Sequence, residues 1–131
     1  MRVLYSRLFT NPHGASCFED QESELKLGFA VPPAEPLYSA QLSPAEVAFW
    51  MGAPATWKGD EPHPAPRRMI FVTVQGEYQI TATGGETRKF PVGSVLLIED
   101  TTGAGHTTKA MSAEDTVVLA VGLPAASSDS N

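Results

Sequence analysis

The chain has 131 residues, a length that fits one domain with its own hydrophobic core. Nine basic against fifteen acidic residues give a net charge of −6, and no basic cluster exceeds two adjacent residues, which disfavours nucleic-acid binding. The single cysteine, Cys17, excludes an intramolecular disulfide framework and is typical of a reducing compartment, and no apolar run is long enough for a membrane helix. We therefore expect a cytoplasmic protein that binds neither nucleic acid nor a membrane.

Short apolar segments alternate with proline and glycine turns along the chain, a pattern typical of β-strands joined by tight turns. Gly84-Gly85 marks one such turn, because adjacent glycines supply the positive φ angles that hairpin turns require. Helical periodicity is almost absent. The sequence predicts an all-β fold with strands at Arg2–Phe9, Leu25–Val31, Val47–Met51, Arg68–Gln75, Glu77–Thr83, Thr87–Phe90, Val95–Ile98, His106–Met111 and Thr116–Leu123.

Three of the predicted strands carry apolar residues on both faces, namely Arg68–Gln75, Val95–Ile98 and Thr116–Leu123. An antiparallel sheet with one face in water would instead alternate apolar with polar residues. One face of these strands can be buried in the core of the chain, so the other face needs a second cover. That cover can be another sheet, the N-terminal segment or a second copy of the chain. Pairing of identical patches is the commonest solution, so we predict a homodimer.

Two motifs between Gly59 and Met111 resemble those of the cupin superfamily. The first runs His-x-His, three or four residues, Glu, six residues, Gly, and is similar to His63-Pro-Ala-Pro-Arg-Arg-Met69 followed by Phe-Val-Thr-Val-Gln-Gly76. The second runs from Phe90-Pro-Val-Gly93-Ser94 through an apolar strand to Glu99-Asp-Thr-Thr-Gly-Ala-Gly105-His106. The resemblance implies a double-stranded β-helix, or jelly-roll barrel, over residues 46–123. Residues 1–45 would then form a strand extension that packs on the barrel or exchanges with a neighbouring chain, and 124–131 a disordered tail.

Typical cupins hold a transition metal with three histidines and a glutamate, and this chain departs from that set. By the resemblance, His63 and His106 occupy two ligand positions, whereas Ala65 replaces the second histidine and Met69 replaces the glutamate. A methionine thioether is a poor substitute for a carboxylate toward most divalent ions. We therefore expect no cofactor. The alternative is a metallocupin, dioxygenase-like, with a divalent transition metal held by His63, His106 and Glu61.

An apolar barrel with two histidines suits proton transfer on a small, mostly apolar organic molecule, the chemistry of isomerases, cyclases and lyases. We expect His63 or His106 to be the general base, with Asp100, Glu99 or an arginine as its orienting partner. Non-catalytic binding or sensing of a small molecule is the alternative, because a barrel does not imply chemistry. The side chains expected to contact the ligand are Arg67, Met69, Phe71, Thr73, Trp57 and Leu96.

Overall fold

The structure, a computed structural model, describes residues 1–126 and consists there of β-strands and loops, which confirms the all-β prediction. None of the described segments is an apolar helix long enough to cross a membrane. Three strands, β2, β4 and β6, are additional to those predicted. The strands are β1 (Arg2–Thr10), β2 (Ser16–Glu24), β3 (Lys26–Val31), β4 (Ala34–Ser39), β5 (Val47–Ala53), β6 (Lys58–His63), β7 (Met69–Gln75), β8 (Tyr78–Ala82), β9 (Thr87–Phe90), β10 (Val95–Ile98), β11 (His106–Ala110) and β12 (Thr116–Gly122).

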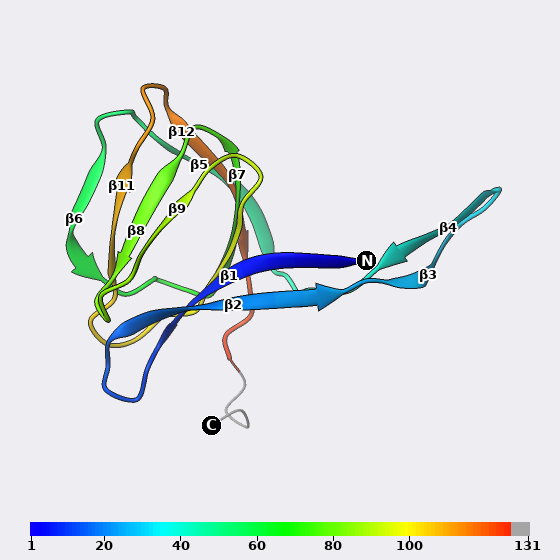
Figure 1. Cartoon of the computed structure of the whole chain (residues 1–131), viewed down its shortest axis with the longest axis horizontal. Helices are drawn as coiled ribbons and strands as arrows, with labels where there is room; N and C mark the ends of the chain where they lie inside the picture. Colours follow the sequence, from blue (N-terminus) through cyan, green and yellow to red (C-terminus); the bar gives the residue numbers. More distant parts are fainter. Residues whose placement is uncertain (127–131) are drawn as a thin grey trace.

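Two sheets face each other and make up the body of the molecule (Figure 1). The larger sheet has the order β2-β1-β10-β7-β12-β5, and the smaller has the order β6-β11-β8-β9. β1 runs parallel to β10, and the other neighbours are antiparallel. Within residues 1–126, strand pairing does not continue from one sheet into the other, so the strands form a two-layer sandwich and not the closed barrel that the cupin resemblance implied.

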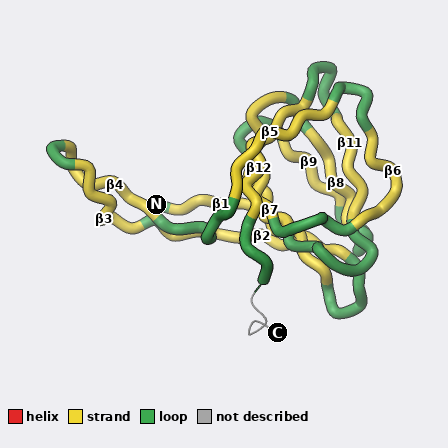
Figure 2. The backbone as a smooth tube through the Cα atoms, turned by 180° about the vertical axis from the view of Figure 1, so that it is seen from behind, coloured by secondary structure: helices red, strands yellow, loops and turns green. Residues whose placement is uncertain are grey.

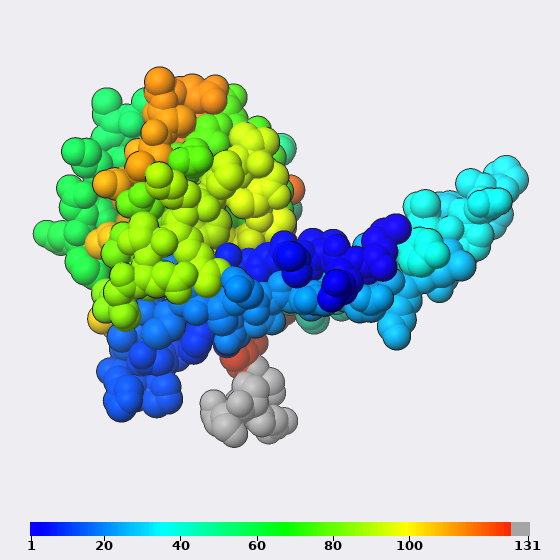
Figure 3. Space-filling model, in the orientation of Figure 1, coloured from blue at the N-terminus to red at the C-terminus, as the bar shows by residue number. Residues whose placement is uncertain are grey.

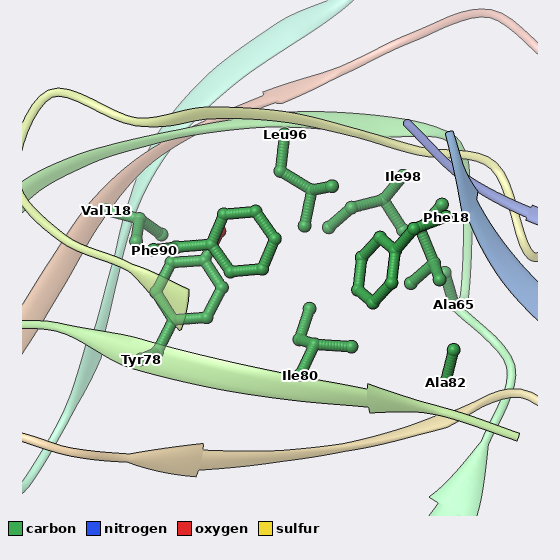
Figure 4. Close-up of a cluster of buried hydrophobic side chains, with 10 residues drawn as sticks. Phe18, Ala65, Tyr78, Ile80, Ala82, Phe90, Leu96, Ile98 and Val118 are labelled. Carbon is green, nitrogen blue, oxygen red and sulfur yellow. The ribbon is translucent and has the colours of Figure 1, made fainter. Parts of the chain in front are cut away.

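The space between the two sheets holds the hydrophobic core (Figure 4). Leu96 and Ile98 enter it from β10, and Tyr78 and Ile80 enter it from β8, in each case at every second position of a strand. Phe90 stacks on Tyr78 with ring centroids 4.9 Å apart. Burial of these side chains removes the inner faces of both sheets from water, which is the main force holding the layers together.

The N-terminal segment is partly built into the larger sheet and partly projects from it. β1 and β2 pair over their whole length, and β1 also pairs with β10. β3 and β4 form a separate hairpin that extends away from the two sheets (Figures 1 and 2). Of the predicted tail, residues 127–131 lie outside the described residues, whereas Arg68 donates a hydrogen bond of 2.7 Å to the carbonyl oxygen of Pro124.

Candidate functional site

A cavity of about 380 Å³ opens between the two sheets, next to the core cluster. Its volume lies within the range of sites that bind small molecules, about 300–1,000 Å³. The larger sheet contributes walls from β5, β7, β10 and β12, and the smaller sheet contributes walls from β6, β8 and β11. Most of the lining is apolar, and the polar side chains that reach it are His63, Tyr78, His106, Thr108 and Thr116.

The two histidines of the motifs meet at the wall of this cavity. His106 is the first residue of β11 and pairs across the strands with His63, the last residue of β6. Their ring centroids lie 5.2 Å apart, and both side chains line the cavity. The structure thus brings His63 and His106 together, as the predicted shared pocket requires.

The close approach of β6 to β11 depends on Gly105, which precedes His106. Gly105 has a positive φ of 75°, and a Cβ atom at this position would collide with the backbone carbonyl group of His63. Only glycine satisfies both conditions without displacing one strand. The spacing of the two imidazoles therefore depends on the missing side chain at Gly105.

Asp100 orients the imidazole of His106. Its Oδ2 atom lies 2.5 Å from Nδ1 of His106, and both side chains are buried. Because an ionised carboxylate only accepts hydrogen bonds, Nδ1 carries the hydrogen, and Nε2 is the nitrogen left for a ligand. His63 has the same tautomer, since its Nδ1 atom lies 3.0 Å from the carbonyl oxygen of Pro64. In its neutral form, each of the two rings therefore offers Nε2 as a proton acceptor.

Tyr78 lines the cavity, and its hydroxyl hydrogen-bonds with Thr73, which lies outside the cavity walls. Burial raises the pKa of this phenol above its usual range, and a hydrogen bond with Thr73 opposes the shift only in part. The hydroxyl therefore stays protonated at neutral pH. The ring of Phe71 packs edge-on against Tyr78 with centroids 6.2 Å apart, so the phenol is held within an aromatic wall.

Of the six residues that were predicted to contact the ligand, three line the cavity and three lie outside it. Met69, Phe71 and Trp57 line the cavity, as predicted, with Trp57 partly open to solvent. Thr73 and Leu96 are buried in the core near Phe90 and lie outside the cavity walls. The hydroxyl of Thr73 bonds to the carbonyl oxygen of Phe90 at 3.3 Å and serves the core.

Arg67 is the sixth of these residues, and it also lies outside the cavity. Its Nη2 atom donates to Glu46 at 2.8 Å and to the carbonyl oxygen of Leu123 at 3.2 Å. The guanidinium thus ties the start of β5 to the end of β12. The structure gives Arg67 this structural role and does not bring it to the predicted ligand site.

Glu99 is not part of the cavity, although the sequence made it a catalytic candidate. Its carboxylate accepts hydrogen bonds from Nε of Arg7 at 2.6 Å and from Nε of Arg68 at 2.7 Å. Burial alone would raise the pKa of Glu99, but the hydrogen bonds and positive charges of Arg7 and Arg68 outweigh burial and hold that pKa below its usual range. Glu99 is therefore the centre of an ion-pair network on the larger sheet, because it points opposite to its neighbour Asp100.

The structure does not assemble the alternative metal site. Glu61 lies on β6 with an exposed side chain and is not among the cavity walls. Over residues 1–126, no three His, Cys, Asp or Glu side chains are grouped so that they could hold a metal ion. The set His63, His106 and Glu61 therefore does not fit a transition metal in this arrangement.

Most of the lining residues were not among the predicted site residues, including Tyr78, Thr108, Ala110, Met51 and Thr116. Thr108 and Ala110 follow His106 at every second position of β11, so strand alternation alone would have found them. Met51 and Thr116 reach the cavity through the pairing of β5 with β12, which places Thr116 beside Ala53. No local pattern in the sequence signals that pairing.

Comparison with solved structures gives a structural similarity, whereas the sequence comparisons give none. No family model matches the chain, and no curated protein matches it. Among solved structures, the chain is similar to the crystal structure of Drosophila melanogaster CENP-C bound to CAL1, with a TM-score of 0.46 and 15% sequence identity. The match covers 74% of this chain and 75% of that chain.

Proposed function

We propose that this chain is a cupin-type jelly-roll protein that binds a small, mostly apolar organic molecule in its cavity and transfers a proton on it. The observation that carries the proposal is the buried pair of His106 and Asp100 at the wall of a largely apolar cavity. The order of the two cupin-like motifs and the facing sheets support the jelly-roll assignment.

The chemistry follows from the tautomer of His106. Its Nε2 atom accepts a proton from a weakly acidic C–H or O–H group of the bound molecule, and Asp100 stabilises the imidazolium that forms. The same imidazolium can return the proton to a different atom of that molecule, so an isomerisation balances with no other reactant. The low dielectric of the cavity strengthens the attraction between the imidazolium and the carbanion or enolate that it faces.

The size and lining of the cavity favour compact carbonyl compounds. A carbonyl group acidifies the neighbouring C–H bond, and the hydroxyl of Thr108 can donate a hydrogen bond to a carbonyl oxygen. Met69 and Phe71 surround the apolar part of such a molecule. Small cyclic ketones match these requirements.

Deuterium exchange tests the proposal. Cyclohexanone and its α,β-unsaturated analogue are incubated with the protein in D₂O, and loss of the proton signal next to the carbonyl is followed by NMR. We expect deuterium exchange to be faster with the protein than in buffer. The exchange rate should fall by about a hundredfold or more in His106→Ala. It should not change in His13→Ala, because His13 lies on an exposed turn. Binding without exchange in the wild type would instead favour the non-catalytic alternative.

A further inference from the structure

The lysines of this chain differ from its arginines in how their charges are paired. Each of the five arginines forms an ion pair with a carboxylate. None of the four lysines takes part in an ion pair within residues 1–126, and three of them, Lys58, Lys89 and Lys109, lie on the smaller sheet. In a chain with a net charge of −6, these positive groups are therefore gathered where no carboxylate neutralises them.

Strand pairing places these three lysines in one row across the smaller sheet. Lys109 on β11 lies opposite Lys58 on β6 and, on its other side, opposite Gln79 on β8, which lies opposite Lys89 on β9. Cross-strand partners share a face, and this face points away from the core because Tyr78, the neighbour of Gln79, is buried in the core. The space-filling view shows β8, β9 and β11 with no other segment in front of them (Figure 3). We call the three lysines the lysine row.

The lysine row contains a repulsive contact. Lys58 and Lys109 lie directly opposite each other on neighbouring strands, and like charges at such positions destabilise a sheet. Lysines on the edge strands β6 and β9 also discourage pairing with other sheets, but Lys109 lies on an inner strand, between β6 and β8. Protection of an edge therefore does not account for Lys109. A bound anion would turn the repulsion between the two ammonium groups into attraction for the ligand.

A shallow groove of about 150 Å³ lies beside Lys109 on the same side of the sheet. Asp60, Gln79 and Thr81 also line this groove. The ammonium group donates hydrogen bonds, the carboxylate accepts them, and the amide and hydroxyl groups do both. The volume is below the range of about 300–1,000 Å³ for sites that enclose a whole small molecule. The groove therefore suits one unit of a longer molecule that lies across the sheet.

We propose that the outer side of the smaller sheet binds an acidic oligosaccharide, a chain of sugar units that carry carboxylate groups. The carboxylates pair with the lysine row, whose backbones are about 5 Å apart between Lys58 and Lys109 and about 10 Å apart between Lys109 and Lys89. Hydroxyl groups of one sugar unit donate to Asp60 and bond with Thr81 in the groove. The proposal is independent of what the cavity binds.

The mixed chemistry of the groove favours a sugar acid over other anions. A polyphosphate offers Asp60 no donor and brings further negative charge beside it, whereas a sugar ring carries several hydroxyl donors. A peptide that binds a sheet through its backbone lies along a strand edge, whereas the lysine row crosses the strands. The ligand that satisfies both the lysine row and Asp60 therefore combines carboxylates with hydroxyl groups.

Thermal unfolding at low ionic strength tests the repulsion within the lysine row. Lys58→Gln should raise the melting temperature of the protein without ligand by about 1–4 °C, because it removes one of the two opposed charges. Lys26→Gln is the matched control, since Lys26 lies opposite Ser39 on the β3–β4 hairpin, and it should leave the melting temperature unchanged. An unchanged or lower melting temperature in Lys58→Gln would remove the repulsion on which the proposal depends.

NMR titration with trigalacturonic acid tests binding. At neutral pH and low ionic strength we expect saturable shifts of amide signals in β8 and β11. The Kd should rise by about tenfold or more in Lys109→Gln, because a charged hydrogen bond is lost. Lys26→Gln should bind as the wild type does, since Lys26 lies outside the smaller sheet. No saturable binding by the wild type, or an unchanged Kd in Lys109→Gln, would overturn the proposal.

Three further ligands test which chemistry is recognised. The methyl ester of trigalacturonic acid keeps the hydroxyl groups without the charges, whereas tripolyphosphate and an end-blocked peptide of three aspartates keep charges without the sugar hydroxyls. Each should bind about tenfold or more weakly than trigalacturonic acid. Equal binding of the methyl ester would show that the lysine row is not used. Equal or tighter binding of tripolyphosphate or of the aspartate peptide would show a site for anions in general, and either result would overturn the assignment to an acidic oligosaccharide.

Discussion

Oδ2 of Asp100 lies 2.5 Å from Nδ1 of His106, and the Asp100 side chain is completely buried. Its second oxygen, Oδ1, is also buried and has no hydrogen-bond partner within the described chain. The carboxylate therefore depends on His106 for its side-chain hydrogen bond. In return it fixes the tautomer and the ring orientation of the histidine.

Asp100→Asn tests whether the charge of the Asp100 carboxylate, and not its volume, is needed for proton transfer. The amide has nearly the same volume as the carboxylate but cannot stabilise an imidazolium, so the rate of deuterium exchange should fall by about a hundredfold or more. Circular dichroism should show that the fold is retained. Asp115→Asn, at an exposed position, should leave the rate unchanged. A wild-type rate in Asp100→Asn would remove Asp100 from the mechanism.

Gly105→Ala should disturb the histidine pair. A methyl group there collides with the backbone of His63, and the positive φ adds strain of about 1–2 kcal/mol. Gly85→Ala is the matched control, because Gly85 also has a positive φ but has open space at the Cβ position. In urea denaturation the free energy of unfolding should fall more for Gly105→Ala than for Gly85→Ala. An equal decrease in the free energy of unfolding for both variants would show that the close contact of Gly105 with His63 does not contribute to stability.

Glu99 should make stability depend on acid pH. Its pKa in the folded state is held below that of the unfolded chain, about 4.3, so its contribution is complete above that pH and is lost as the pH falls through the folded-state pKa. The difference in melting temperature between wild type and Glu99→Gln should therefore be largest near pH 7 and shrink below about pH 4. Glu114→Gln, with an exposed side chain, should show no such trend. A difference that stays constant with pH would contradict this account.

Strand alternation predicts much of the fold and also accounts for the opposite roles of two neighbouring acidic residues at the site. Leu96, Ile98 and Asp100 share one parity and face inward, whereas Leu97 and Glu99 face outward. The same rule separates the orienting Asp100 from the ion-paired Glu99. Alternation alone does not distinguish Met69 and Phe71 from Thr73, because all three face the same side of β7. Met69 and Phe71 line the cavity, whereas Thr73 lies further along the strand, where it bonds to Phe90 in the core.

The strands that the sequence did not reveal are edge strands. β2 contains acidic residues with low strand propensity, β4 contains Pro36 and β6 contains Pro62. Each has only one strand neighbour in its sheet, so proline is tolerated there and no continuous apolar pattern is needed. β2 and β4 each pair with the strand just before them, whereas β6 pairs with the distant β11, a partner that local patterns do not encode.

Filling the cavity should abolish ligand binding without unfolding the protein. Ala110 is half-buried on the inner side of β11 and lines the cavity, so Ala110→Leu places additional atoms in it. Thr107→Val, on the outer side of the same strand, is the control. NMR titration with cyclohexanone should show saturable shifts for wild type and Thr107→Val but not for Ala110→Leu. Unchanged binding by Ala110→Leu would place the ligand elsewhere.

The most direct test of the proposed site is ¹⁵N NMR of the three histidine side chains, with and without cyclohexanone. We predict that His106 and His63, when neutral, carry the hydrogen on Nδ1 and have an unprotonated Nε2, because Asp100 and the Pro64 carbonyl accept from Nδ1. Cyclohexanone should shift the Nε2 signal of His106 and leave the ring signals of His13 unchanged. A hydrogen on Nε2 of His106, or an Nε2 signal that does not respond to the ketone, would contradict the assignment of His106 as the base of a ligand-binding cavity.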